Sequence, residues 1–380
     1  MFKDIFNARY ILSAKRWPWI DYTRGICIIL VCYRHCFEGI KESGLPIHDY
    51  PVLEILNVCF YSFRMPLFFI VSGLFVSHSL AKKTLGNYVG NRFKIIFYPL
   101  LVWGSIQITL QLLMKDYVNA KPVPFDYINL IIYPRNPSNN QQFWYLNALF
   151  FVGAFYAIFK VVLKFKIWHQ LILSIVFFSI AGFLEYNGIA FYIFPDIFHF
   201  YIYFCIGDMI SAFIFNRQND AVITSRKWLL PSVILFVITQ SLFTIINIQH
   251  NEDNFVDHRI PYLFLVISLS GCTVIVQLAI VLEQTRLVKW LRVIGYHSLY
   301  IYLIHLMLIA SVRIVLVKVL GVTSIPVILV LAIAVGVVVP IILYNLSTRI
   351  GAWWLFSLKK PEEEIKFYKH RHKELKIVKQ

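Results

Sequence analysis

Apolar runs of about 20 residues, the length that spans a bilayer as helix, recur from one end of the chain to the other. They are rich in Leu, Ile, Val and Phe and lack the alternation of membrane-barrel strands. Because lipid offers the backbone no hydrogen bonds, such runs are expected to be α-helices. The pattern predicts ten membrane-spanning helices, near residues 19–38, 53–78, 95–114, 143–162, 167–185, 198–215, 228–248, 261–282, 295–317 and 325–346.

The composition agrees with a polytopic membrane protein of the all-α class. Of the 380 residues, 59% are hydrophobic and only 15% are charged, which is far from the balance of a soluble domain. We predict a cytoplasmic segment over 1–18, a ten-helix membrane domain over 19–346 and a charged cytoplasmic tail over 347–380. The expected location is the plasma (inner) membrane.

The positions of Lys and Arg predict which side of the membrane each loop faces. With a cytoplasmic N-terminus, 26 of the 36 Lys and Arg residues fall in cytoplasmic segments, six in outer loops and four within spans. Cytoplasmic loops of membrane proteins carry such an excess. Both termini are therefore predicted to be cytoplasmic.

Charge and cysteine content exclude several classes of function. The net charge of +16 does not indicate nucleic-acid binding, because the basic residues cluster at helix ends, where topology and anionic lipids account for them. The six cysteines lie within spans or at their edges and show no C-x-x-C spacing, so neither a disulfide framework nor a thiolate site is expected. Since paired metal-ligand spacings are also missing, we expect no metal.

The first predicted span carries four ionisable groups, Asp21, Arg24, Arg34 and His35. At about 100° per residue, Arg24 and His35 lie within about 20° of one another on the helix, about 16 Å apart along its axis. Asp21 lies near the same face, whereas Arg34 is turned by about 100° from His35. The helix thus presents a polar stripe that begins at the cytoplasmic end and penetrates the bilayer.

Ionisable groups inside a membrane are costly and usually face a cavity or a pathway. For Arg24 and His35 we therefore favour a functional role over a packed, satisfied histidine. For Asp21, an ordinary acidic residue in the first helical turn, paired with Arg24, is the alternative to substrate binding.

The stretch "IDYTRGICIILVCYRH" (20–35) resembles the first helix of the membrane acyltransferase-3 family, whose hallmark is an arginine followed eleven positions later by a histidine. Four further stretches are similar to later family segments, in the family's order: "FRMPLFFIVSGLF" (63–75), "NRFKIIFYP" (91–99), "FWYLNALFF" (143–151) and "SLYIYLIH" (298–305). The chain departs from the family at one point. Many members carry a second arginine three residues after the one matched by Arg92, and that position is Ile95 here.

The resemblance implies transfer of an acyl group, usually acetyl from cytoplasmic acetyl-CoA, to a hydroxyl of a glycan or glycolipid. Other enzymes of cell-surface polysaccharides would then be partners. Arg24 and Arg92 would bind the donor, because a guanidinium forms forked hydrogen bonds with phosphates. His35 would be the general base or, alternatively, an acyl carrier.

Three further residues are candidates for the same site. His305 lies within a span, where a buried imidazole is either catalytic or structural. Arg64 is expected to bind substrate or donor, or to pair with Glu54 or Asp208. Trp144 lies at an outer helix end, either as a residue of the aromatic belt or as a platform for a sugar ring.

A transporter or flippase is the rival hypothesis, because it would also carry polar residues near the middle of the membrane. Such proteins often show interrupted helices at corresponding positions of two halves. The prolines within the spans, Pro66, Pro99, Pro231 and Pro340, form no such pair.

Overall fold

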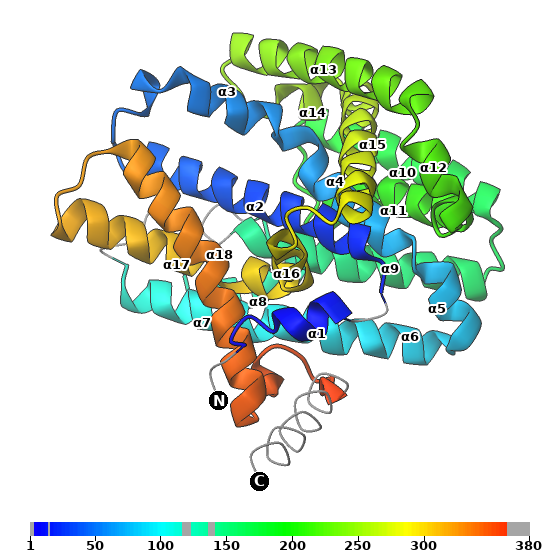
Figure 1. The fold of residues 1–380 in the computed structure, drawn as a ribbon, viewed down its shortest axis with the longest axis horizontal. Coiled ribbons are helices and arrows are strands. Elements are labelled where there is room, and N and C mark those ends of the chain that lie inside the picture. The colour runs from blue at the N-terminus through cyan, green and yellow to red at the C-terminus, as the bar shows by residue number, and fades with distance from the viewer. Residues whose placement is uncertain (1–3, 14–15, 116–122, 136–140, 363–380) are drawn as a thin grey trace.

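The computed structural model describes residues 4–13, 16–115, 123–135 and 141–362, and every regular element in these ranges is helical (Figure 1). The prediction of an all-α protein is confirmed. Nine segments in these ranges are long and apolar enough to cross a membrane: Pro51–Lys82, Leu85–Leu113, Trp144–Val161, Ile167–Tyr186, Phe194–Ile214, Arg226–Gln249, Pro261–Thr285, Ser298–Val319 and Ile325–Ile350. They correspond to nine of the ten predicted spans.

The bounds of the helices follow the chain in three groups. The first group is α1 (Ala8–Ser13), α2 (Pro18–Lys41), η1 (Ile47–Asp49), α3 (Pro51–Cys59), α4 (Tyr61–Gly73), α5 (Val76–Lys82), α6 (Leu85–Arg92), the π-helix η2 (Phe93–Phe97) and α7 (Tyr98–Leu113). The second is α8 (Asp126–Ile132), η3 (Gln141–Phe143), α9 (Trp144–Val161), α10 (Ile167–Tyr186), α11 (Phe194–Ile214), η4 (Arg217–Asn219), α12 (Asp220–Ile223) and α13 (Arg226–Gln249). The third is α14 (Phe255–Arg259), α15 (Pro261–Thr285), α16 (Trp290–Tyr296), α17 (Ser298–Ile314), the π-helix η5 (Val315–Val319), α18 (Ile325–Ile350) and η6 (Trp353–Leu355).

Helix α2 corresponds to the first predicted span and lies in the middle of the bundle, where it packs against α4, α15, α16, α17 and α18 (Figure 1). Its 24 residues give a length of about 36 Å, enough to cross a bilayer. Its ionisable groups distinguish it in composition from the nine segments, although its length lies within their range of 18 to 32 residues. Neighbouring helices bury Asp21 fully and Arg24, Arg34 and His35 in part.

The second and third predicted spans are less regular than the sequence indicated. The second is divided into α3, α4 and α5, with breaks at Phe60 and at Leu74–Phe75. The third was expected to begin near residue 95, but its helix begins at Leu85, because the Thr84 hydroxyl accepts a hydrogen bond from the backbone of Asn87 and caps a polar first turn. A hydropathy pattern locates the apolar part of a helix and misses such a polar extension.

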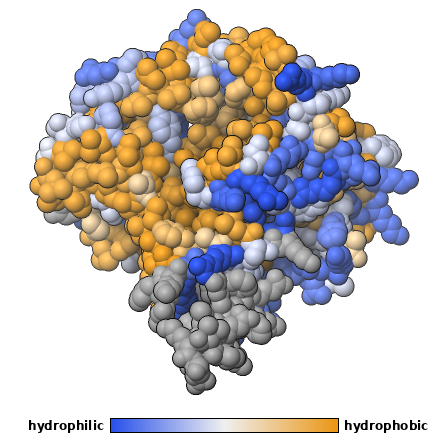
Figure 2. All heavy atoms as spheres, viewed as in Figure 1, coloured by the Kyte–Doolittle hydropathy of each residue, from blue (hydrophilic) through white to orange (hydrophobic). Residues whose placement is uncertain are grey.

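The outer faces of the bundle are apolar. Figure 2 shows a broad hydrophobic area on the left of the view, over α17 and α18, whereas hydrophilic residues gather on the lower right. On α13, Leu230 and Ile238 are 62% and 60% exposed. Exposed aliphatic side chains on long helices are suited to contact with lipid chains. The protein is therefore a multi-pass membrane protein.

The N-terminal segment and the end of the last span lie together. The Asn345 side chain donates a hydrogen bond to the Ile5 carbonyl (2.9 Å), and Arg349 donates to the Asp4 carbonyl. The segment before the first span and the end of the last span thus meet at one end of the bundle. An even number of membrane crossings brings them to the same end. This arrangement supports α2 as the tenth span.

The backbones of α16 and α2 are in direct contact, because Gly295 of α16 and Gly25 of α2 face one another. A Cβ atom added at Gly295 would lie 1.7 Å from the Asp21 carbonyl oxygen, and one at Gly25 would lie 2.4 Å from the Leu291 carbonyl oxygen. Real Cβ atoms do not approach oxygen so closely, so any side chain at Gly295 forces the two helices apart.

We expect Gly295→Ala to lower the thermal unfolding temperature in detergent, since overpacking costs about 1–3 kcal/mol. Gly90→Ala on α6 is the matched control, because a Cβ there meets nothing within 4 Å and alanine favours helix. Equal unfolding temperatures for the two variants would contradict the close contact between α2 and α16.

The predicted topology can be tested by labelling introduced cysteines in intact cells. A membrane-impermeant maleimide should label Phe125→Cys and leave Asp220→Cys unlabelled until the cells are opened, because the Lys and Arg bias places the second site in the cytoplasm. Labelling in the reverse order would invert the orientation of the bundle.

Candidate functional site

Two histidines from helices far apart in sequence meet within the bundle. The rings of His35 on α2 and His305 on α17 have centroids 5.1 Å apart and planes inclined by 51°. His305 is fully buried, whereas His35 is partly exposed. The two candidate imidazoles therefore belong to one site.

The backbone of α17 fixes the tautomer of His305. Its Nδ1 lies 2.9 Å from the Tyr302 carbonyl oxygen and 3.1 Å from the Ile301 carbonyl oxygen. Carbonyl oxygens only accept, so Nδ1 carries the hydrogen and Nε2 keeps the lone pair. Nε2 is buried and has no hydrogen-bond partner among the described residues. An unpaired buried acceptor of this kind is available to take a proton.

Two tyrosines extend the site from the histidine pair toward the arginines. The Tyr302 ring lies 5.7 Å from that of His305 and 5.0 Å from that of Tyr145. The Tyr145 phenol is in turn within electrostatic range of both Arg24 and Arg92. Both predicted donor-binding arginines thus act electrostatically on the same side chain, although they lie on different helices.

Arg92 reaches inward from the end of α6. Its guanidinium lies against Gly153 of α9, and its Nη2 donates a hydrogen bond to the Leu149 carbonyl (2.6 Å). Its Nε is buried without a partner among the described residues. Arg92 therefore keeps a donor for a further group while α9 holds its side chain in place.

Arg64 is buried beside the histidine pair. It is 4% exposed, donates to the Leu30 carbonyl from Nη1 (3.1 Å) and lies over the Tyr61 ring at 5.2 Å. Of the two ion-pair partners considered from the sequence, Asp208 pairs instead with Lys160, at 2.5 Å. The position of Arg64 close to His35 leaves a role in the site open to it.

Asp21 is separated from the histidines. It is fully buried and forms an ion pair with Arg16 at 2.9 Å, not the pair with Arg24 considered from the sequence. Fourteen residues of helix place it about 21 Å from His35. The structure thus does not bring Asp21, predicted to bind substrate, to the other site residues around the histidines.

Arg34 is turned away from His35, as the helical geometry predicted. It pairs with Glu38 at 3.0 Å and with Asp253 in the loop before α14. These two carboxylates neutralise the charge of Arg34, which lies toward the end of α2 opposite Asp21. Arg34 therefore stabilises the fold beside the site.

Trp144 begins α9 at that same end of the bundle as Arg34. Its ring lies 5.1 Å from Phe200, and the Arg135 guanidinium lies over it at 3.9 Å. Arg135 also forms an ion pair with Asp196 at 2.7 Å. The sequence analysis missed this cation, because Arg135 comes from a polar loop with no helical pattern.

Tyr302 was also missed. It lies three residues before His305 and so on the same helical face, a signal that the sequence contained. The pairing of Tyr302 with Tyr145 depends on how α9 and α17 pack, and nothing in either segment alone indicates it.

Comparison with known proteins identifies the family of the chain. The family model described as "Acyltransferase domain" matches residues 17–345. The chain is 24% identical over 209 residues to nodulation protein NolL of Mesorhizobium japonicum (55% of this chain, 51% of that protein). It is 30% identical over 89 residues to inner membrane protein YcfT of Escherichia coli K12 (22% and 25%).

The matched regions cover only about half and a quarter of these curated relatives. No solved structure matches the chain. The family model nevertheless spans most of the sequence and includes Arg24, His35 and His305. The chain belongs to the acyltransferase-3 family of membrane proteins.

Proposed function

We propose that the protein is an O-acyltransferase of the plasma (inner) membrane that moves an acetyl group from cytoplasmic acetyl-CoA to a hydroxyl of a cell-surface glycan or glycolipid. The observation that carries the proposal is the contact between the His35 and His305 rings, 5.1 Å apart, on helices of a membrane bundle. A pair of imidazoles with an unpaired nitrogen suits proton transfer, because the lone pair of a neutral imidazole nitrogen can accept a proton and later release it.

In the proposed reaction, His35 accepts the proton of the acceptor hydroxyl while the hydroxyl oxygen bonds to the thioester carbonyl carbon. The carbon–sulfur bond then breaks, and the proton passes to the departing thiolate of CoA. The Tyr302 carbonyl fixes the tautomer of His305, so its Nε2 can accept a hydrogen bond from the His35 ring and orient that ring. An acyl-imidazole on His35 is the second route, and a covalent acetyl adduct formed without acceptor would distinguish it.

Donor binding is proposed at the end of α2 that carries Arg24. Arg24 and Arg92 both lie within electrostatic range of Tyr145, which supports their action on one anionic ligand. A cavity of about 200 Å³ at the base of α16 and α18 is lined by aromatic residues and two lysines: Tyr296, Tyr300, Tyr344, Trp353, Lys359 and Lys360. Stacking surfaces next to ammonium groups suit a phosphorylated nucleotide.

Acceptor binding is proposed at the opposite end of α2, where Trp144 lies. Trp144 and the Arg135–Asp196 ion pair offer an aromatic face and polar groups there, a combination suited to a sugar ring. Arg64, buried near His35, is suited to the oxyanion that develops during transfer. Membrane lipids and other enzymes of cell-surface polysaccharides are the proposed partners.

His35→Ala should abolish acetyl transfer while expression and membrane insertion stay normal. General-base catalysis contributes about 10² to 10⁴ in rate, so a loss of less than about tenfold would contradict the role. The measurements are acetyl-CoA cleavage by the purified protein and mass spectrometry of surface glycans from cells with and without the gene. A transporter has no reason to consume acetyl-CoA.

His305→Ala is the companion variant. If the two rings act together, it should reduce cleavage about as strongly as His35→Ala while CoA still binds. If His35→Ala still cleaves acetyl-CoA and His305→Ala does not, the catalytic histidine is His305 on α17.

Arg24→Lys should weaken CoA binding, because lysine keeps the charge but loses the planar fork that pairs with phosphate. We expect about a tenfold change, the loss of about one charge-assisted hydrogen bond, in calorimetric titration with CoA. Arg34→Lys is the matched control on the same helix, since Arg34 already pairs with Glu38 and Asp253. Unchanged CoA affinity in Arg24→Lys would make Arg24 a structural residue.

A further inference from the structure

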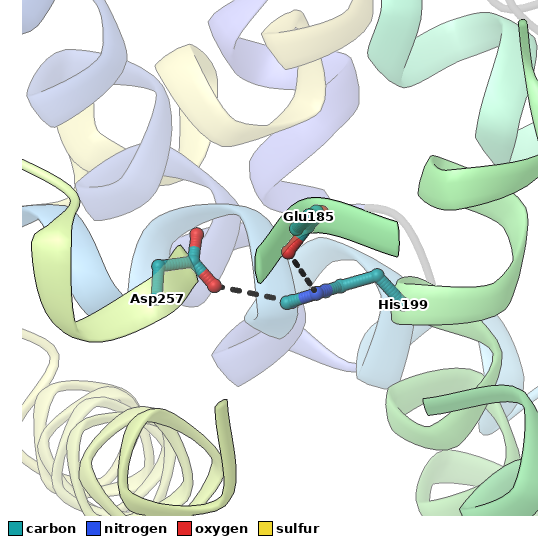
Figure 3. A group of neighbouring side chains, drawn as sticks. All are labelled: Glu185, His199 and Asp257. Atoms are coloured by element: carbon teal, nitrogen blue, oxygen red, sulfur yellow. Dashed lines mark ion pairs between the residues drawn. The ribbon is translucent and has the colours of Figure 1, made fainter. Parts of the chain in front are cut away.

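Three ligand-type side chains converge away from the histidine pair, where three elements meet (Figure 3). Glu185 lies at the end of α10, His199 near the start of α11 and Asp257 within α14. His199 Nδ1 lies 3.9 Å from a Glu185 oxygen, and Nε2 lies 3.6 Å from an Asp257 oxygen. One nitrogen and one oxygen from each carboxylate lie within 4.8 Å of one another.

One polar atom of each of the three side chains is buried without a hydrogen-bond partner in the part of the chain that the structure describes. His199 is 2% exposed, and its Nε2 is buried and unpaired. Oε2 of Glu185 and Oδ1 of Asp257 are also buried and unpaired. Buried polar groups are nearly always paired, so unpaired ligand atoms on three neighbouring side chains, within 4.8 Å of one another, indicate a missing partner.

The charge of the cluster indicates the nature of this partner. The nearby Arg135 is engaged with both oxygens of Asp196, from Nε at 2.7 and 2.8 Å. Glu185 and Asp257 thus present two carboxylates and His199 a neutral ring nitrogen.

We propose that Glu185, His199 and Asp257 bind a divalent transition-metal ion, with Zn²⁺ as the best fit. Zinc takes imidazole nitrogen and carboxylate oxygen together at about 2.0–2.2 Å, often with three protein ligands and one water. Mg²⁺ and Ca²⁺ prefer all-oxygen sites, so the histidine disfavours them. Around a tetrahedral ion, ligand atoms lie about 3.4 Å apart, close to the 3.6 Å between His199 and Asp257.

The position of the cluster assigns the ion a structural role. It would join the ends of α10 and α11 to α14 in the loop between α13 and α15. The sequence analysis expected no metal, because residues 185, 199 and 257 have no motif-like spacing. Only the packing of three separate segments brings them together.

The test is metal binding by the intact protein in detergent, after EDTA treatment and gel filtration. Zn²⁺ added back should give about one tightly bound ion per chain by mass spectrometry of the metal and should raise the thermal unfolding temperature, because a ligand of the native state stabilises it. Mn²⁺ is measured in parallel as a competitor.

Asp257→Asn and His199→Gln keep the side-chain size and remove a ligand, and each should lower Zn²⁺ affinity by about tenfold or more. His258→Gln is the matched control. It removes the neighbouring imidazole of α14, which lies 3.6 Å from the exposed Glu252 carboxylate, and should bind Zn²⁺ as the unaltered protein does.

Two results would overturn the proposal. One is the absence of bound metal and of any thermal shift at saturating Zn²⁺, which would make the cluster a set of protonated, metal-free side chains. The other is unchanged binding in Asp257→Asn and His199→Gln, which would place the zinc elsewhere. Gel-filtration profiles of both variants distinguish loss of a ligand from loss of the fold.

Discussion

The cost of holding charged groups inside an apolar bundle governs this structure. Helix α2 lies among five other helices, and two of its charged groups meet that cost with ion pairs to α2 itself and to nearby loop segments. Asp21 is paired by Arg16, and Arg34 by Glu38 and Asp253. Of the four ionisable groups singled out in the sequence, Arg24 and His35 have no ion pair among the described residues. The stripe therefore combines a paired Asp21 with Arg24 and His35, which have no ion pair, and the proposed reaction uses only these two.

Much of the fold was predictable, because the signal for a membrane helix is local. Runs of apolar residues predicted nine of the long segments, and helical periodicity alone predicted that Arg24 and His35 share a face and that Arg34 does not. Errors occurred where local polarity and structure disagree. The capped, polar turn at Thr84 extends the third span, and the breaks at Phe60 and Leu74 divide the second.

The site was predictable only in part, because most of its contacts join segments far apart in sequence. His305 was named from a family resemblance, but its contact with His35 depends on how α17 packs beside α2. The electrostatic influence of both Arg24 and Arg92 on Tyr145 likewise depends on three helices. Asp21 illustrates the limit of periodicity. It lies near the helical face of His35, but at about 1.5 Å per residue it is about 21 Å away along the axis, too far to belong to the same site. Glu185, His199 and Asp257 have no local signal at all.

The π-helix η2 directly follows Arg92 and links α6 to α7. Each of its turns holds an extra residue relative to an α-helix, so it sets the rotation of one helix about the axis of the next. Deleting one residue from Phe93–Phe97 would barely change the length of the span, yet it would rotate α6 by about 100° against α7. Arg92 would then leave the Leu149 carbonyl, while the apolar contacts of α7 kept their register. In homologues, insertions and deletions in this segment should therefore accompany a change in where the arginine occurs. Ile95, where this chain departs from the family pattern, lies within the π-helix, so the departure can reflect a shift of register by one residue as well as a change of residue type.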